Sequence, residues 1–140
     1  MDEIFIRERA LIGDAAFEKL KNSAVAVFGL GGVGSYVCEA LARAGIGKLL
    51  LCDDDVIAVH NGNRQLFALN STVGRKKAEV AAERMRDINP DIKLDVRAER
   101  YEASTEEDFN LAEYNYVADC IDWLLPKFCL PSGAKKKEFL

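Results

Sequence analysis

No stretch of this sequence is long and apolar enough to cross a membrane. The best apolar run, residues 24–28, stops at a glycine cluster, whereas a membrane helix needs roughly 20 apolar residues. A secretory signal is missing too, because the chain starts with the acidic residues Asp2 and Glu3 and no apolar core with a cleavage site follows. We therefore expect a cytoplasmic protein that does not associate with membranes.

Metal-ligand spacing is also absent. The four cysteines never form a CxxC pair, and the chain has a single histidine, His60, so a zinc ribbon is excluded. Cys52 and Cys120 end apolar, strand-like runs, where a free thiol behaves as a small hydrophobic group. We expect the cysteines to be structural and His60 to have a noncatalytic role in a loop.

The charge balance excludes binding to polyanions by bulk charge. The 140 residues include 19 Lys plus Arg and 23 Asp plus Glu, which gives a formal net charge of −4. With 49% hydrophobic and 30% charged residues, the composition is that of one globular domain and not of a disordered chain. Any anion site must therefore be local.

The first half of the chain has the pattern strand, glycine turn, helix, strand. Residues 14–22 predict a short helix, and the continuous apolar run 24–28 is typical of a strand covered on both faces. Apolar residues then repeat at helical spacing from Val33 to Ala44, and residues 48–52 form a second apolar run. This is a βαβ unit.

The second half continues the alternation. Ser71 or Thr72 can cap a helix that ends at residues 89–90, and residues 92–98 alternate as a less buried strand does. A polar helix is predicted over 104–112, followed by a strand over 116–121 that ends in Asp122. We predict an α/β fold with a Rossmann-like, doubly wound and mostly parallel sheet that stops after this last strand.

The glycine turn between the first strand and its helix fits the pattern GxGxxG through Gly29, Gly31 and Gly34. Such glycines permit a tight turn and a close backbone approach to phosphate at a helix N-terminus. Asp53 follows Gly34 by 19 residues, at the end of the second strand, where an acceptor for a ribose hydroxyl is expected. The pattern predicts nucleotide binding, with a purely structural glycine turn as the alternative.

The surrounding charges favour ATP over a dinucleotide. ATP carries about four negative charges and needs cations and magnesium, whereas a helix N-terminus satisfies most of a dinucleotide diphosphate. Arg64 follows the second strand, the run 75–77 is Arg-Lys-Lys, and Asp122 could hold Mg²⁺ at the same sheet edge. No Gly-Lys-Ser/Thr P-loop is present, which disfavours a Walker-type ATPase.

Each of these residues could instead have a purely structural role. Arg64 could be a surface arginine, and residues 75–77 could be a solvated first helical turn. Lysines at a helix start oppose the helix dipole, which favours a phosphate role for at least one of them. Of the three consecutive aspartates, we assign Asp54 to capping or solvating the turn.

Taken together, these motifs resemble the ThiF/MoeB/HesA superfamily, the relatives of ubiquitin-activating enzymes. The resemblance is carried by residues 29–34, the Asp53-x-Asp55 pair, residues 61–65, Lys77 and residues 119–122. Segments 5–13, 34–36, 70–74 and 86–90 are similar to the branch of tRNA threonylcarbamoyladenosine dehydratases. The resemblance covers residues 4–122.

The resemblance implies an ATP-dependent enzyme that adenylates a carboxylate. For this branch it implies a tRNA carrying threonylcarbamoyladenosine as partner, a homodimer in the complete form, and ATP and Mg²⁺ as cofactors. The implied site is a phosphate cradle (Gly29, Gly31, Gly32, Gly34), a ribose acceptor (Asp53), triphosphate ligands (Asn61, Arg64, Lys77), further nucleotide-site residues (Asp55, Gln65), a magnesium ligand (Asp122) and an arginine that reaches the neighbouring subunit's site (Arg7).

The chain also departs from the family pattern. Asp54 stands where an apolar residue is usual, Gly62 replaces a bulkier one, and residues 123–133 look foreign within an atypical tail, 123–140. Because family members are longer, we expect residues 1–140 to be a single, incomplete ATP-binding adenylation domain that does not complete the dehydration alone.

Three other functions stay open at this point. The first is adenylation of the C-terminus of a ubiquitin-like sulfur carrier, which would give the chain a sulfur-transfer protein as partner. The second is a noncatalytic nucleotide-binding fragment. The third, an NAD-dependent dehydrogenase, is disfavoured by Arg64 and Lys77.

Overall fold

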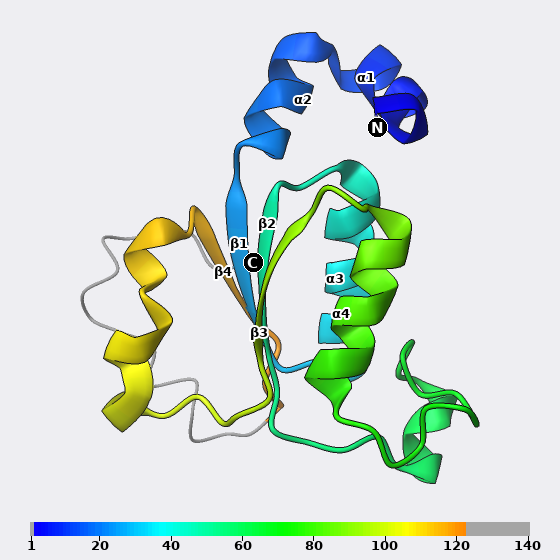
Figure 1. The fold of residues 1–140 in the computed structure, drawn as a ribbon, viewed down its shortest axis with the longest axis vertical. Helices are drawn as coiled ribbons and strands as arrows, with labels where there is room; N and C mark the ends of the chain where they lie inside the picture. The colour runs from blue at the N-terminus through cyan, green and yellow to red at the C-terminus, as the bar shows by residue number, and fades with distance from the viewer. Residues whose placement is uncertain (1, 123–140) are drawn as a thin grey trace.

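A four-stranded parallel sheet forms the centre of the protein, in the computed structural model that describes residues 2–122 (Figure 1). The strand order is β3-β2-β1-β4, and all three pairings are parallel. The strands are β1 (Ala24–Phe28), β2 (Lys48–Cys52), β3 (Lys93–Arg97) and β4 (Tyr116–Asp119). The α/β, Rossmann-like prediction is therefore confirmed, with β4 ending two residues before the predicted end at residue 121.

Helices α3 (Gly34–Ala44) and α4 (Lys77–Ile88) cover one face of the sheet (Figure 1). Buried residues of the two helices, most of them small, pack against β1 and β2. This core includes Cys38 and Ala42 of α3, Ala78, Ala81 and Met85 of α4, and Val27 and Leu51 of the strands. On the outer surface, Arg84 and Arg43 both donate to the Glu39 carboxylate. These hydrogen bonds, that of Arg84 first, hold the pKa of Glu39 below its usual value, and the network joins the two helices.

The opposite face is covered by short 3-10 helices, in the stretch 104–112 for which the sequence predicted one polar helix. Residues Ala103–Phe109 and Leu111–Glu113 form two 3-10 segments, separated by Asn110 in a left-handed conformation (φ 42°). The stretch is helical as predicted, but it is 3-10 and interrupted, because this polar sequence has no apolar stripe to bury. It is anchored instead by Phe109, whose ring lies 5.7 Å from that of Phe28 and 5.1 Å from that of Tyr101.

Helix α4 begins later than predicted, at Lys77. Neither Ser71 nor Thr72 caps it, because the Thr72 hydroxyl donates to the carbonyl of Phe67 and closes a loop. The following residues pair with the segment after β2: the amide of Ile57 donates to Arg75, and that of Lys77 donates to Asp55. The helix can start only where this pairing stops. Its predicted end near residue 89 is confirmed.

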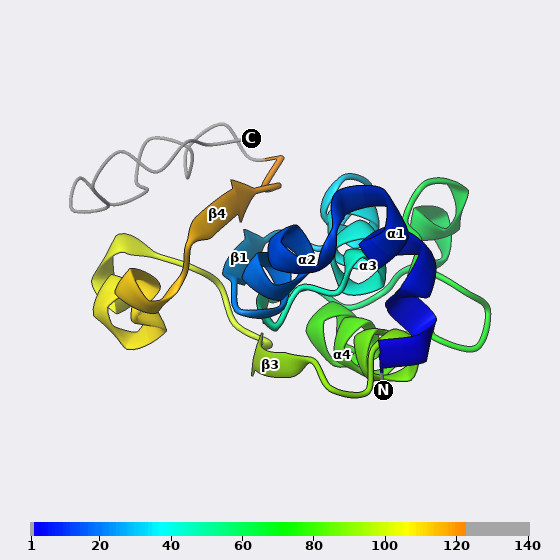
Figure 2. The same cartoon turned by 90° about the horizontal axis from the view of Figure 1, so that it is seen from above.

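Two helices precede the sheet, α1 (Ile6–Ile12) and α2 (Asp14–Lys21), after a 3-10 turn over Asp2–Phe5. Only α2 was predicted. Both lie at the end of the sheet where the strands begin (Figures 1 and 2), and Gly13 separates them with φ 83°. The rings of Phe5 and Phe17, 5.3 Å apart, pack the 3-10 turn against α2, and the Phe17 ring contacts the end of α3, where a Cβ on Gly45 would lie 2.8 Å from it. No helix of the described part of the chain has the length and apolarity to span a membrane.

The strand order reverses direction beside β1. The chain moves outward from β1 to β2 and β3, then returns to place β4 on the other side of β1. In open parallel sheets, such a switch point leaves a crevice outside the carboxyl ends of the strands, where ligands bind. The glycine turn after β1 lies at this point.

Backbone packing in the turn requires glycine at two positions. Gly29 has φ 85°, and a Cβ there would lie 2.8 Å from the carbonyl oxygen of Cys120. A Cβ on Gly34 would lie 1.7 Å from the carbonyl oxygen of Gly29. Helix α3 can therefore approach the end of β1 only without a side chain at Gly34.

We predict that Gly34→Ala destabilises the protein by about 1–3 kcal/mol or more, since the added methyl group forces the turn away from the helix. The measurement is the urea dependence of unfolding, followed by circular dichroism. The matched control is Gly62→Ala, because a Cβ on Gly62 meets nothing closer than 3.7 Å and should change stability by less than about 1 kcal/mol. Equal unfolding midpoints for the two variants would contradict the packing described above.

Candidate functional site

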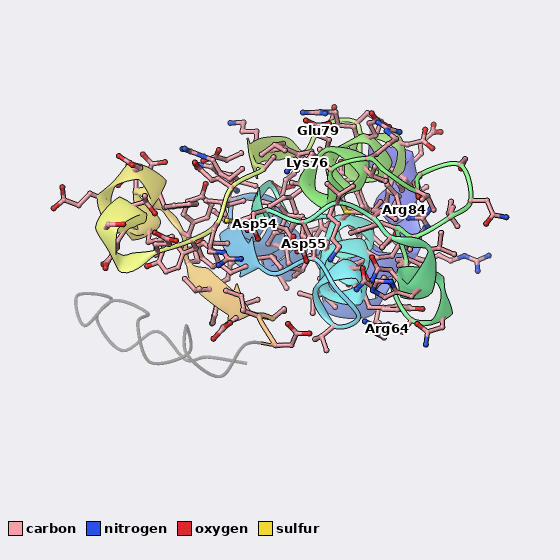
Figure 3. The ribbon with its side chains drawn as sticks, turned by 90° about the horizontal axis from the view of Figure 1, so that it is seen from below. Asp54, Asp55, Arg64, Lys76, Glu79 and Arg84 are labelled. Carbon is pink, nitrogen blue, oxygen red and sulfur yellow. The ribbon has the colours of Figure 1, made fainter. Side chains whose placement is uncertain are left out.

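A cavity of about 490 Å³ opens at the carboxyl ends of the strands. Figure 3 views this end from below, with Asp54 and Asp55 near the middle and Arg64 to one side. The structure brings ten of the predicted site residues to its wall: Gly29, Gly31, Gly32, Asp53, Asp55, Asn61, Arg64, Gln65, Lys77 and Asp122. They come from five separate segments, so only the fold makes them a site.

Two predicted residues do not line this cavity. Gly34 lies beneath the wall, where it allows the close packing described above. Arg7 is exposed on α1, at the opposite end of the sheet (Figure 1). Within one chain, Arg7 is therefore far from the cavity.

Asp53 fixes the shape of the glycine turn. Its Oδ2 accepts a hydrogen bond from the backbone amide of Leu30 (2.7 Å), and its Oδ1 accepts one from the amide of Asp55 (2.8 Å). Burial raises the pKa of the Asp53 carboxyl, and these two amides oppose that shift. The carboxylate thus links the end of β2 to the turn after β1, and its remaining lone pairs are the acceptors it can offer a ligand.

Lys77 brings a buried cation to the cavity wall. Its side chain is only 6% exposed, and its Nζ lies 2.9 Å from Oδ2 of Asp55, whose side chain is 62% exposed. The backbone amide of Lys77 also donates to the carbonyl of Asp55. A buried ammonium group beside a solvent-accessible carboxylate can exchange this partner for a ligand anion with little rearrangement.

The other two cations of the run 75–77 point elsewhere. Arg75 pairs with Glu83 on the exposed side of α4, and Lys76 donates to the backbone carbonyl of Asp54 (2.9 Å). Neither lines the cavity. Of this run, only Lys77 is placed to meet a phosphate there.

The loop over residues 59–65 is held in place by buried polar groups. Asn61, 5% exposed, accepts the amide of Ala58 at its Oδ1 (2.9 Å). The hydroxyl of Ser35, at the start of α3, accepts the amide of Leu66 (3.1 Å). This second contact fixes the loop against the glycine turn, and sequence reasoning missed it.

Arg64 lies across the glycine turn with its guanidinium on the loop. Its Cγ is 3.6 Å from the position of a Cβ on Gly32, and its Nη1 donates to Asn63 (2.9 Å) and to the carbonyl of His60 (3.3 Å). Gln65 is buried nearby, 3.5 Å from the corresponding position on Gly31. The loop therefore brings the side chains of Arg64 and Gln65 next to the glycine turn, where they can donate hydrogen bonds to an anion.

The segment after β3 supplies wall residues that were not predicted, namely Glu99, Arg100 and Tyr101. Arg100 donates from Nε to Oδ2 of Asp54 (3.1 Å), so Asp54 does more than cap a turn. Only their position after the predicted strand 92–98 pointed to this edge of the sheet. Without the strand order, nothing distinguished them from a surface loop.

The cysteines of the described residues are free thiols, as predicted. Burial raises the pKa of Cys38, and it raises that of Cys52 to about 12. The Cys52 thiol donates to the carbonyl of Glu99 (3.3 Å). Cys129 lies outside the described residues. The one group within residues 2–122 whose ligand atoms lie close enough for a shared metal is Asp53, Asp54 and Asp55, within 4.8 Å of one another.

The cavity thus combines amides at a helix start, the three cations Arg64, Lys77 and Arg100, and several carboxylates at a topological switch point. Such a combination accepts a polyphosphate at the turn and offers oxygen ligands to a divalent cation. The chain matches the ThiF family over residues 5–137. It belongs to that family, and the match extends through residues 123–133, which the sequence analysis set apart and which lie outside the described residues.

Its relatives within the family include enzymes of tRNA modification. The chain is 42% identical over 134 residues to the tRNA threonylcarbamoyladenosine dehydratase of Bacillus subtilis, covering 96% of this chain and 53% of that protein. It is 35% identical over 126 residues to the sulfur carrier protein ThiS adenylyltransferase of Escherichia coli, covering 86% of this chain and 50% of that protein. The chain therefore spans about half the length of these relatives.

A solved structure shows the same fold with a nucleotide. The crystal structure of the Escherichia coli tRNA threonylcarbamoyladenosine dehydratase in complex with ATP has a TM-score of 0.89 and 40% sequence identity, and the match covers 92% of this chain and 53% of that one. The same enzyme has also been solved in complex with AMP. The chain thus shares fold and family with adenylating enzymes.

Proposed function

We propose that residues 1–140 form one ATP-binding unit of an enzyme that adenylates a carboxylate. Our preferred substrate is tRNA carrying threonylcarbamoyladenosine. The observation that carries the proposal is the buried ammonium group of Lys77 at the wall of the cavity that the glycine turn and Arg64 also line. The identity to tRNA threonylcarbamoyladenosine dehydratases supports this choice of substrate.

The charges support ATP over a dinucleotide. Lys77 and Arg64 add two positive charges to the amides of the turn, more than a dinucleotide diphosphate requires. On binding, a triphosphate would take the place of Asp55 as the partner of Lys77. Asp53 would add a ribose hydroxyl to the two amides that it already accepts.

The chemistry follows from this placement. An oxygen of the substrate carboxylate attacks the α-phosphorus of ATP, the bond to the bridging oxygen of pyrophosphate breaks, and an acyl-adenylate forms. In the dehydratase reaction an internal group then attacks the activated carbonyl, the ring closes and AMP leaves. Because the carboxylate is itself the nucleophile, the site must position the reactants and stabilise charge, and it needs no general base for the first step.

Magnesium in nucleotide sites is held by one or two carboxylates together with the phosphates of the nucleotide. The carboxylate of Asp122 lines the wall after β4 and is exposed, and hard carboxylate oxygens suit Mg²⁺. We propose Asp122 as its protein ligand. The ion would neutralise part of the triphosphate charge.

Two related functions remain as alternatives. The relative that adenylates a sulfur carrier favours activation of a ubiquitin-like C-terminus, with a sulfur-transfer protein as partner. A noncatalytic nucleotide-binding unit is the second alternative. A tRNA substrate would place the reaction in the cytoplasm.

Exchange of labelled pyrophosphate into ATP tests the adenylation step. We expect the chain to catalyse exchange with Mg²⁺, ATP and tRNA that carries threonylcarbamoyladenosine, and not with unmodified tRNA. Exchange that depends on a sulfur-carrier C-terminus would favour the first alternative, and ATP binding without exchange would favour the second. That this chain does not complete the cyclisation stays a prediction, checked by mass spectrometry of the nucleoside in the same reactions.

We predict that Arg64→Ala and Lys77→Ala each weaken ATP binding by about 1.5–3 kcal/mol, because each removes a charge-assisted hydrogen bond to the β- or γ-phosphate. Binding of AMP should change little. Titration calorimetry with both nucleotides measures the two effects. The control is Arg43→Ala, which removes an exposed, ion-paired arginine outside the cavity. Equal weakening of ATP and AMP would contradict this assignment.

We predict that Arg7 acts in the neighbouring subunit of a homodimer, since it lies at the opposite end of the sheet from its own cavity. In a complete family member, mixing Arg7→Ala subunits with Lys77→Ala subunits should restore activity in a fraction of heterodimers, each of which keeps one intact composite site. The measurement is turnover after subunit exchange, with each homodimeric variant as control. Verified heterodimers that stay inactive would show that Arg7 does not complete the partner's site.

A further inference from the structure

We propose that the side chain of Gln65 binds the α-phosphate of the nucleotide, which is the phosphate that stays on the adenylate when pyrophosphate leaves. The inference rests on the proposed function and deepens it. The resemblance to the family implies that Gln65 belongs to the nucleotide site, but it gives this side chain no partner within the nucleotide.

The amide group of Gln65 is buried, yet its side chain makes no hydrogen bond within residues 2–122. The residue is 8% exposed and lines the cavity. Among the described residues, its hydrogen bonds come from the backbone alone, and the side-chain amide opens to the cavity and is not sealed in the core. Buried amides are nearly always hydrogen-bonded, so an amide without a partner in a cavity wall points to a ligand that supplies one.

The backbone around Gln65 is fixed, so its side chain leaves the loop at a defined place. The amide of Gln65 donates to the carbonyl of Asn61 (2.9 Å), and its carbonyl accepts the amide of Ala68 (3.1 Å). The amide of the next residue, Leu66, donates to the fully buried hydroxyl of Ser35 in the first turn of α3 (3.1 Å). The loop and the helix that follows the glycine turn therefore hold this side chain between them.

The contacts along the glycine turn show which part of a nucleotide Gln65 would meet. Its Nε2 lies 3.5 Å from the position of a Cβ on Gly31. The residue before Gly31 donates its amide to Asp53, the proposed ribose acceptor (2.7 Å). The residue after it, Gly32, lies under the side chain of Arg64, whose Cγ is 3.6 Å from its Cβ position. A nucleotide that extends from a ribose at Asp53 to terminal phosphates at Arg64 therefore passes its first phosphate beside Gln65.

An amide at this point serves the reaction in a way that the cations do not. Its N–H would donate to a non-bridging oxygen on the α-phosphorus, and hydrogen bonds to a charged acceptor are stronger than neutral ones. When pyrophosphate leaves, Lys77 and Arg64 lose the phosphates that they held. The α-phosphate remains in the acyl-adenylate, so Gln65 would keep this intermediate in place until the second step.

The test compares ATP, AMP and adenosine as ligands of the 140-residue chain by competition calorimetry. We expect Gln65→Met, which keeps the volume and removes the donor, to lower the ratio of AMP to adenosine affinity roughly 10- to 100-fold. Adenosine affinity and the ratio of ATP to AMP affinity should stay unchanged. Gln65→Glu should lower AMP affinity at least as much, because it places a carboxylate beside the phosphate.

Two control variants separate the α-phosphate from the other phosphates and from general effects. Lys77→Ala should lower the ratio of ATP to AMP affinity and leave the ratio of AMP to adenosine affinity unchanged. Arg43→Ala, which removes an exposed ion-paired arginine outside the cavity, should change neither ratio. Unfolding midpoints show whether the two Gln65 variants fold alike, and the nearly isosteric Gln65→Glu keeps the test valid where Gln65→Met is unstable.

The possible results distinguish this inference from the proposed function. Equal loss of AMP and adenosine affinity in Gln65→Met would overturn the inference in favour of a contact to the nucleoside or a structural role. A lower ratio of ATP to AMP affinity alone would overturn it in favour of the outer phosphates, and unchanged affinities would overturn it outright. Each of these results leaves the proposed function standing, whereas failure of the unaltered chain to bind ATP would overturn both.

Discussion

The carboxylate of Asp53 is the interaction on which the site depends. It accepts the amide of Leu30 from the turn after β1 and the amide of Asp55 from the segment after β2. These two segments follow neighbouring parallel strands, and the carboxylate holds their ends at one fixed separation. The close packing of α3 on the turn, through Gly34, and the position of Asp55 beside Lys77 both follow from that link. This arrangement has a cost, because it buries the Asp53 carboxyl and burial raises the pKa of that group.

The second constraint is the placement of positive charge. Lys77 is the first residue of α4, where the helix dipole disfavours a cation, and its side chain is almost fully buried. The carboxylate of Asp55 offsets both the unfavourable helix dipole and the burial of the Lys77 ammonium group, and the Asp55 side chain is itself mostly exposed. The ammonium group is thus stabilised by a partner that can give way to an incoming phosphate. Arg64, which lines the same cavity, rests on a loop that Ser35 ties to α3.

Local patterns were enough to predict the strands, α3 and the glycine turn, because apolar runs and helical spacing reflect burial directly. They failed where distant residues decide the conformation. Thr72 closes a loop on Phe67 in place of capping α4, and the stretch 103–113 winds as 3-10 helix around Phe109. The same reason explains why Arg100 was missed, since its partner is 46 residues away. The cations near the turn were predictable, but only the fold distinguishes Lys77 from Arg75 and Lys76.

We propose that this edge of the sheet binds a triphosphate in preference to a dinucleotide. Titration calorimetry of the 140-residue chain with ATP in the presence of Mg²⁺, and with NAD under the same conditions, tests it most directly. Tighter binding of Mg-ATP, weakened when Mg²⁺ is chelated, is the result that the charges of Lys77, Arg64 and Asp122 predict. Tighter binding of NAD would contradict it.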